Sequence, residues 1–296
     1  CYSAGNDGPA GSSVHPPGTS KDIITSGATS NATAATIIAD FSSRGPCNDG
    51  RMKPTLVAPG YFLYSSAGAA TNTYLGMAGT SMSNPCIAGN AALVRDYFAR
   101  GFYPTGDSVV GNRWTFIPAA VVKAMLINGA SPQMDGFTVP DNNIGWGRVS
   151  LDDVLYFAND IRKLTVLQET VSTGQYDEFI VSVNNQSEPL KIAVVWTDYP
   201  ATAGASPAIV NNLDLLVTGP NAVVYHGNQY TSGQSTPGAT AWDNLNVEEC
   251  VRRDVPETGN WTIRVTGTAV PSGTRQPYAV VVSGGIGPTS TPCLNV

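Results

Sequence analysis

The sequence has little charge and very little histidine. Charged residues make up 13% of the 296, about half of the ~25% usual in globular domains. The 16 lysines and arginines against 22 acidic residues give a net charge of −6, which argues against a nucleic-acid-binding protein because that function needs a basic patch. No apolar run approaches the roughly 18 residues of a transmembrane helix, so we expect no membrane span. The five cysteines form no Cys-x-x-Cys pair, which makes a zinc site unexpected.

The residues that are abundant predict a globular, turn-rich protein. Apolar residues reach 42%, enough for a buried core, and 31 glycines and 21 prolines predict many turns and short strands. Asn31, Asn185 and Asn260 each begin an Asn-x-Ser/Thr glycosylation triplet. Together with the acidic, lysine-poor composition, these triplets favour a secreted protein or one in an extracellular or vesicular lumen.

The composition changes near residue 160 and predicts two domains, residues 1–160 and 161–296. In the first, apolar periodicity predicts a buried helix over residues 81–100. A second helix is expected over 119–128, between Pro118 and Gly129, and a short third one over 151–158. Residues 23–28 and 55–58 are expected to be buried strands. Strands alternating with helices predict an α/β sheet.

The second domain is predicted to consist of strands alone. Apolar Trp261, Ile263 and Val265 alternate with polar residues, which is typical of a strand with one buried face. The short strands between Gly, Pro and Asn turns predict a β-sandwich, and a jelly roll is the favoured form. The eight expected strands are 163–171, 176–184, 190–199, 213–219, 222–226, 244–255, 261–268 and 278–284.

The strongest chemical signal is Gly-Thr-Ser-Met-Ser-Asn-Pro at residues 79–85, followed by Ile-Ala-Gly at 87–89. A glycine turn that enters a buried helix places the Ser81 hydroxyl at the helix N-terminus. Free N–H groups and a partial positive charge there can stabilise an oxyanion. The alternative interpretation is that Ser81 is simply a helix cap, a frequent role of serine.

The whole block resembles the nucleophile motif of the subtilisin-like serine proteases, the subtilases. That family usually has Ala where this chain has Ser83, and often His where it has Cys86. Residues 3–8, Ser-Ala-Gly-Asn-Asp-Gly, resemble the family segment whose Asn donates to the oxyanion. The resemblance therefore implies that Ser81 is the catalytic nucleophile and Asn6 the oxyanion donor. For Asn6 the alternative is a turn residue, since Asn-Asp-Gly is a turn signal.

Other segments extend the resemblance over almost the whole chain. Ser3, Ala4, Gly5, Gly27 and Ala28 resemble residues that line the primary specificity pocket and bind substrate. Residues 145–149 (Gly-Trp-Gly-Arg-Val), 195–200 (Val-Trp-Thr-Asp-Tyr-Pro) and 210–215 (Val-Asn-Asn-Leu-Asp-Leu) resemble the KP-43-like group of subtilases, which carry a C-terminal jelly roll. The implied fold is an α/β subtilisin-like catalytic domain, N-terminally truncated, three-layered and with a parallel sheet, followed by an all-β sandwich.

A catalytic Asp and His are not found where the family has them. In subtilisin-like enzymes both precede the serine along the chain. His15 lies outside a Gly-His-Gly-Thr motif and His226 lies in the predicted sandwich, so both are interpreted as surface residues. We expect a serine endopeptidase acting on proteins or peptides, with its Asp and His on an N-terminal catalytic segment outside this chain. The alternative is an inactive fragment or pseudoprotease whose β-sandwich is a binding module.

No cofactor is required for this chemistry, and a structural Ca²⁺ is the one metal expected. Asp198 and Asp214 lie at predicted strand ends in Asn-rich loops, and carboxylate oxygens suit a hard cation. The alternative is that both are solvated turn carboxylates.

Overall fold

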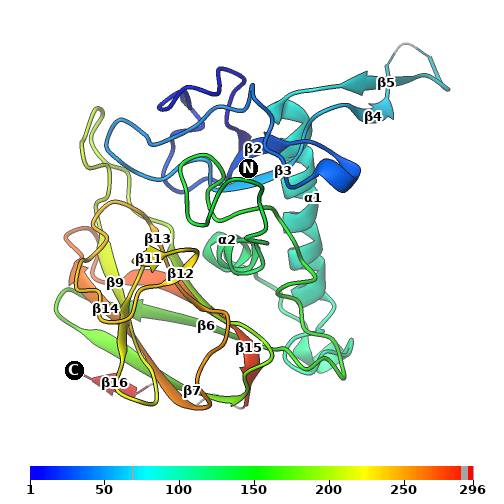
Figure 1. Ribbon diagram of the computed structural model, residues 1–296. Coiled ribbons are helices and arrows are strands. Elements are labelled where there is room, and N and C mark those ends of the chain that lie inside the picture. Colours follow the sequence, from blue (N-terminus) through cyan, green and yellow to red (C-terminus); the bar gives the residue numbers. More distant parts are fainter. Residues whose placement is uncertain (69, 288–292, 296) are drawn as a thin grey trace. The chain divides into compact units, whose positions relative to one another are not determined.

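The computed structural model describes residues 1–68, 70–287 and 293–295. The chain forms two compact units, and the division falls inside helix α1 (Thr80–Ala99). Unit 1 comprises residues 1–92 and 130–150, and unit 2 comprises 93–129 and 151–296. Structure built from strands alone begins at residue 163, as the sequence predicts (Figure 1). The helical stretch 93–129 nevertheless belongs to the same unit as those strands.

Unit 1 is built on a small parallel sheet in the order β1 (Tyr2–Ser3), β2 (Thr25–Thr29), β3 (Leu56–Pro59). The strands expected over 23–28 and 55–58 are thus present, shifted by one or two residues. All five residues of β2 are buried, and their small size lets neighbouring elements approach closely. Beside the sheet, Val57 packs in an apolar cluster whose other members are Ile38, Met134, Val139 and Ile144.

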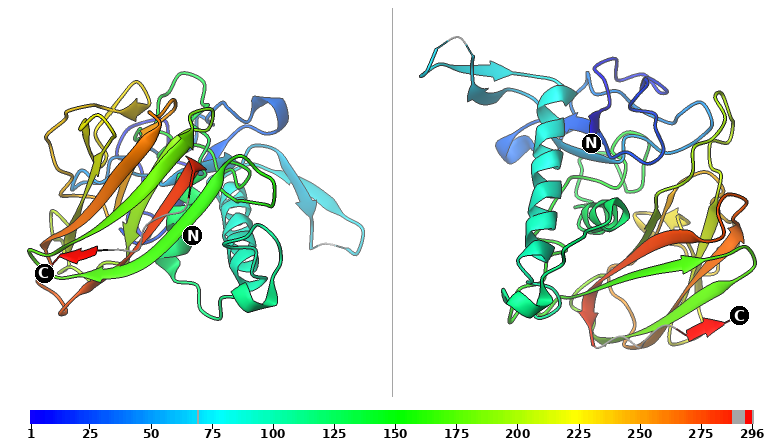
Figure 2. Two further views of the ribbon diagram at one scale, coloured as in Figure 1. Left: turned by 90° about the horizontal axis from the view of Figure 1, so that it is seen from below. Right: turned by 180° about the vertical axis from the view of Figure 1, so that it is seen from behind.

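A hairpin that the sequence did not predict leads into α1. It consists of β4 (Leu63–Ser66) and β5 (Tyr74–Met77), and Figure 2 shows it projecting from the rest of unit 1. Its tyrosines Tyr64 and Tyr74 are 79% and 74% exposed. A short 3₁₀ turn, η1 (Ala32–Ala34), precedes β3 in the same unit.

Two of the three predicted helices are present. Helix α1 begins one residue earlier than expected, and α2 (Ala119–Asn128) has the predicted bounds, with Pro118 at its N-cap and Gly129 at its C-cap. A 3₁₀ turn, η2 (Val110–Asn112), lies in the connecting loop.

The prediction of a third helix over 151–158 is wrong, because this segment forms turns. Its backbone groups have other partners: Asp153 O accepts a hydrogen bond from Lys191 Nζ at 2.9 Å, and Phe157 N donates to Asp160 Oδ2 at 2.9 Å. These two bonds take the place of the helical bond between Phe157 N and Asp153 O.

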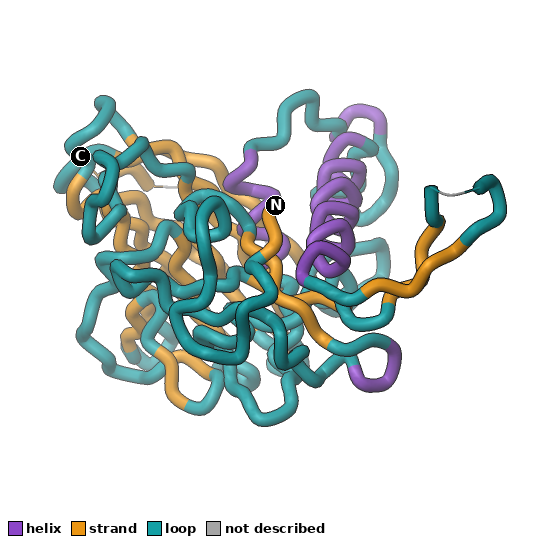
Figure 3. The backbone as a smooth tube through the Cα atoms, turned by 90° about the horizontal axis from the view of Figure 1, so that it is seen from above, coloured by secondary structure: helices purple, strands orange, loops and turns teal. Residues whose placement is uncertain are grey.

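Unit 2 is a two-sheet sandwich. One sheet runs β13–β8–β15–β6 and the other β10–β9–β14–β7, joined where the last residues of β15 pair with β7. Figure 3 shows these strands in orange. The strands of unit 2 are β6 (Lys163–Val171), β7 (Tyr176–Asn185), β8 (Leu190–Trp196), β9 (Asn212–Thr218), β10 (Val224–His226), β11 (Tyr230–Thr231), β12 (Gln234–Ser235), β13 (Glu248–Arg253), β14 (Gly259–Ala269), β15 (Gln276–Ile286) and β16 (Cys293–Asn295). Strands β11 and β12 form a separate two-stranded sheet, and β16 pairs with β7.

The core of unit 2 lies between the two sheets, as the alternation predicted. Trp261, Ile263 and Val265 point inward from β14, and Val194 and Val280 meet them from the other sheet. All eight predicted strands are found. Three are shorter than expected: the segment 190–199 forms a strand only at Leu190–Trp196, 222–226 only at Val224–His226, and 244–255 only at Glu248–Arg253. Asp243 causes the later start of β13, because its carboxylate accepts hydrogen bonds from the backbone of residues 245 and 246.

Helix α2 packs against β8 and β15 within unit 2. Its residues 121–128 are all buried, which is typical of a helix enclosed on every side. Asn128 Nδ2 donates to Lys191 O and Val281 O at 3.0 and 3.1 Å. Lys123 Nζ lies 2.8 Å from Glu248 Oε2, and both side chains are almost completely buried. In the part of the chain that is described, no helix is long and apolar enough to cross a bilayer.

Breaking the Lys123–Glu248 pair tests how α2 is anchored. We expect Lys123→Ala to lower the free energy of unfolding by about 3–5 kcal/mol, because it leaves a buried carboxylate without its partner. The double variant Lys123→Met/Glu248→Met should recover most of that loss, since it removes both charges. Urea unfolding measures both effects, and equal losses in the single and double variants would contradict this account.

Candidate active site

Ser81 lies in the first turn of α1, where the sequence placed it. Gly79 has a φ of +155°, a conformation that side chains disfavour, and it turns the chain from β5 into the helix. Its carbonyl accepts the first helical hydrogen bonds, from Met82 N at 3.0 Å and Ser83 N at 3.4 Å. Ser81 is exposed, and no described residue hydrogen-bonds its hydroxyl. A free hydroxyl therefore stands at the positive end of a 20-residue helix.

Asn6 is held against the start of this helix through its side-chain oxygen. Asn6 Oδ1 accepts hydrogen bonds from Thr80 N at 2.9 Å and from Thr80 Oγ1 at 3.0 Å. Because a backbone N–H can only donate, the amide oxygen must face Thr80, and the NH₂ group must point away from it. A Cβ on Gly79 would lie 3.4 Å from Asn6 Nδ2 and 3.7 Å from Ser81 N. The Asn6 amide and the Ser81 backbone N–H therefore both lie close to Gly79, next to the Ser81 hydroxyl.

Thr80 is a site residue that the sequence analysis missed. Its buried hydroxyl accepts a hydrogen bond from Gly5 N at 3.1 Å and donates to Asn6 Oδ1. Thr80 therefore fixes both the backbone and the side chain of the oxyanion segment. The available signal was a hydroxyl next to Ser81 in the same motif.

The five predicted substrate-binding residues occupy two adjacent strands of unit 1 and the turn after one of them. Ser3 ends β1, where it pairs with Ser26, and Ala4 and Gly5 follow it. Ser3 and Gly5 are partly exposed, whereas Ala4 is buried. Gly27 and Ala28 are buried in β2, and a Cβ on Gly27 would lie within 3.0–3.1 Å of three side chains. Their role in substrate binding stays a prediction.

Neither histidine contacts Ser81. His15 is exposed, and its Nε2 lies 3.8 Å from Asp7 Oδ2. His226, expected at the surface, is buried in β10, where its ring centre lies 3.9 Å from that of Trp242. That expectation was wrong because Trp242 covers the ring. Burial also lowers the pKa of His226.

The carboxylates of the two predicted calcium ligands, Asp198 and Asp214, accept hydrogen bonds from neighbouring protein groups. Asp198 accepts hydrogen bonds from the backbone of residues 199, 210 and 211 at 2.7–2.8 Å, so it organises the loop before β9. Asp214 accepts hydrogen bonds from Thr268 Oγ1 and from Asn212 Nδ2. Within the described ranges, no three His, Cys, Asp or Glu side chains form a metal-binding cluster. These donors account for both carboxylates without a cation, and the calcium expectation stays a prediction.

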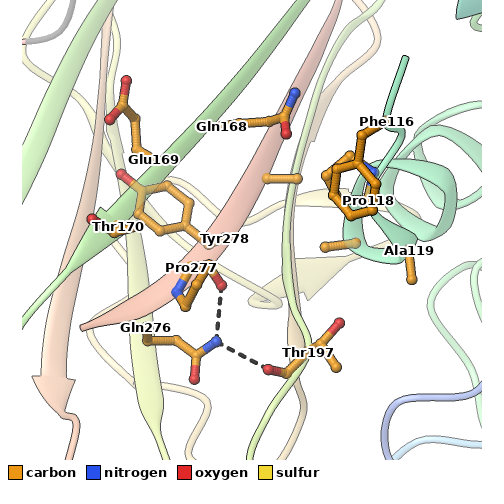
Figure 4. A pocket seen from close by; sticks show the side chains of 12 residues that line it. Phe116, Pro118, Ala119, Gln168, Glu169, Thr170, Thr197, Gln276, Pro277 and Tyr278 are labelled. Atoms are coloured by element: carbon orange, nitrogen blue, oxygen red, sulfur yellow. Dashed lines mark hydrogen bonds between the residues drawn. The ribbon is translucent and has the colours of Figure 1, made fainter. Parts of the chain in front are cut away.

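Unit 2 also contains a cavity of about 520 Å³ beside the first turn of α2 (Figure 4). Phe116, Pro118 and Ala119 form one wall, and Gln168, Thr197 and Pro277 contribute to the others. Gln276 closes one end, where its Nε2 donates to Thr197 O and Pro277 O. The lining is mainly apolar and contains none of the predicted site residues.

Glu249 is a buried acid next to Asp214. Its Oε2 accepts a hydrogen bond from Leu215 N at 2.7 Å, and its Oε1 has no described partner. Burial raises the pKa of Glu249 well above 4.5, and the neighbouring Asp243 and Asp214 raise it further. The folded protein therefore keeps a proton on this carboxyl that the unfolded chain releases.

The pH dependence of stability follows from this proton. As the pH rises above 4.5, the unfolded chain loses the proton, whereas the folded state keeps it until the pH reaches its own higher pKa. Stability should therefore fall across that range. Glu249→Gln mimics the neutral acid, so its melting temperature should exceed that of the wild type by roughly a few degrees at pH 8. The difference should shrink as the pH approaches 4.5, and a difference independent of pH would contradict the assignment.

Comparison with known proteins agrees with the chemistry of unit 1. Residues 1–147 match the model of the subtilase family, peptidase S8. Two proteins of Dictyostelium discoideum are similar to most of the chain, the serine protease/ABC transporter B family proteins tagD and tagA. TagD is 29% identical and the match covers 80% of this chain, whereas for tagA these values are 31% and 83%. The chain spans only 16% and 15% of their lengths.

Among solved structures, the CspB protease of Clostridium perfringens is similar, with 27% identity and a TM-score of 0.39. That match covers 49% of this chain and 28% of the protease. The motif around Ser81, the segment of Asn6 and the family match over residues 1–147 together identify the chain as a member of the subtilase family of subtilisin-like serine proteases.

Proposed function

We propose that this chain supplies the nucleophile and the oxyanion hole of a serine endopeptidase. The observation that carries the proposal is the orientation of Asn6, whose amide oxygen is bound by Thr80 while its Nδ2 is left to donate. Removing one such donor costs about 2.7–4 kcal/mol of transition-state stabilisation, as measured in a subtilisin, a member of the same family.

The reaction would proceed through an acyl-enzyme. Ser81 Oγ attacks the carbonyl carbon of the scissile peptide bond, and the carbonyl oxygen takes up the negative charge. Asn6 Nδ2 and Ser81 N donate to that oxygen, and the partial positive charge of the α1 N-terminus stabilises it further. The intermediate collapses by expelling the protonated amine, and water then hydrolyses the ester on Ser81.

A base must take the proton from Ser81 and pass it to the leaving amine, and we place this catalytic His and its Asp outside these 296 residues. This part of the proposal rests on the contacts of His15 and His226, neither of which includes Ser81. Serine is a weak nucleophile without a base and a group that orients it. The substrates would be protein or peptide chains.

The proposal also covers the domain architecture of the chain and the compartment in which the protein is found. The parallel sheet β1–β2–β3 and α1 would belong to a three-layer α/β catalytic domain in residues 1–160. The sandwich would be a jelly-roll domain in residues 161–296. Asn185 and Asn260 are exposed and could carry glycans, which supports a secreted or vesicular protein.

Two substitutions test the proposed function in the protein that carries this chain. Ser81→Ala should abolish hydrolysis of casein without changing the melting temperature, because only an exposed hydroxyl is removed. Near-normal hydrolysis by a folded Ser81→Ala variant would contradict the assignment.

Asn6→Ala should lower kcat by about 10²–10³-fold with little change in KM, because the donor acts mainly in the transition state.

A further inference from the structure

Ser83, two residues after Ser81 in the first turn of α1, connects this helix to strand β2. Its side chain is completely buried. Ser83 Oγ donates a hydrogen bond to Gly27 O at 2.5 Å and also lies within hydrogen-bond reach of Ser26 Oγ. Ser26 Oγ lies farther from that carbonyl, at 3.5 Å, so the single hydrogen of the Ser83 hydroxyl is directed to Gly27 O, and the Ser26 hydroxyl donates to Ser83. Two hydrogen bonds therefore hold the first turn of α1 on β2.

Strand β2 connects this contact to the oxyanion donor. Ser26 pairs with Ser3 of β1, and its carbonyl accepts a hydrogen bond from Ala4 N at 2.9 Å. Strand β1 continues directly into Gly5 and Asn6. A closed ring thus runs from Asn6 through β1, β2 and Ser83 to the first turn of α1, and returns to Asn6 through Thr80.

Glycine next to the ring allows the first turn of α1 and strand β2 to approach each other closely. Gly60 follows β3, and its carbonyl accepts a hydrogen bond from Gly79 N at 2.8 Å. A Cβ on Gly60 would lie 2.7 Å from Ala28 Cβ and 3.0 Å from Ser83 Cβ. Glycine at this position therefore lets the first turn of α1 approach β2 closely enough for the two hydroxyls to meet.

We infer that the Ser26–Ser83 hydroxyl pair is a positioning device for the reaction. It sets the distance between the Ser81 hydroxyl on α1 and the Asn6 amide in the turn after β1. This inference rests on the proposed function. The pair touches neither substrate nor reacting atoms, and it acts through Asn6 and Ser81. Its effect on the rate should therefore depend on whether Asn6 has a side chain to position.

A double-mutant cycle on kcat tests the inference in the protein that carries this chain. With a chromogenic peptide as substrate, Ser83→Ala should lower kcat by about ten- to a hundredfold, since small displacements of catalytic groups have effects of that size. KM should change by less than about twofold. In the Asn6→Ala background, Ser83→Ala should change kcat by less than about threefold, because the donor that it positions is gone.

Ser13→Ala is the matched control. Ser13 is also a buried serine of unit 1, and its hydroxyl makes two hydrogen bonds, donating to Ala10 O at 2.7 Å and accepting from Arg44 N at 2.9 Å. It lies outside the ring. Ser13→Ala should lower the melting temperature about as much as Ser83→Ala, and it should leave kcat unchanged in both backgrounds.

The outcomes separate the inference from the proposed function. Hydrolysis that survives Ser81→Ala overturns the proposed function. If Ser81→Ala abolishes hydrolysis, equal effects of Ser83→Ala with and without the Asn6 side chain overturn the positioning role, as does an unchanged kcat. Should Ser83→Ala not fold, Ser26→Ala replaces it in the cycle, because that variant keeps the Ser83–Gly27 hydrogen bond. The same dependence on Asn6 is then expected, and its absence overturns the inference.

Discussion

Two hydrogen bonds to a single amide oxygen, Asn6 Oδ1, join the turn after β1 to the start of α1. They satisfy the N–H and the hydroxyl of Thr80, and they turn the amide nitrogen of Asn6 toward the region beside Ser81. Without this contact nothing would orient the exposed Asn6 side chain, and Ser81 would be an ordinary serine at a helix end. The chemistry of the chain depends on the two segments being held together, although they lie 74 residues apart in the sequence.

The buried neighbours of this contact are small and polar. Thr80, Ser26 and Ser83 have hydroxyls that bond to one another or to the backbone, and glycine occupies the positions where the elements approach most closely. Such a network fixes geometry more strictly than apolar packing, because each hydrogen bond has a preferred direction and an unpaired buried hydroxyl is costly. Unit 2 differs: an apolar core fills the space between its two sheets.

The sequence predicted what depends on local patterns. Alternation placed the strands of unit 2, Pro118 and Gly129 gave the bounds of α2, and the glycine–hydroxyl motif placed Ser81 at the start of α1. The sequence-based prediction failed where the local structure depends on residues that are distant in the sequence. The segment 151–158 is not a helix because Lys191 and the Asp160 carboxylate bind the backbone groups of Asp153 and Phe157, and His226 is buried by Trp242. The roles of Thr80 and Ser83 depend on contacts with β1 and β2 that no local pattern reveals.

The central claim is that Ser81 and Asn6 act on the same carbonyl group. A crystal structure of the protein that carries this chain, after reaction with diisopropyl fluorophosphate, tests it most directly. The account predicts a covalent bond from Ser81 Oγ to phosphorus, with the phosphoryl oxygen about 2.7–3.1 Å from both Asn6 Nδ2 and Ser81 N. An adduct on another residue, or a phosphoryl oxygen directed away from Asn6, would contradict it.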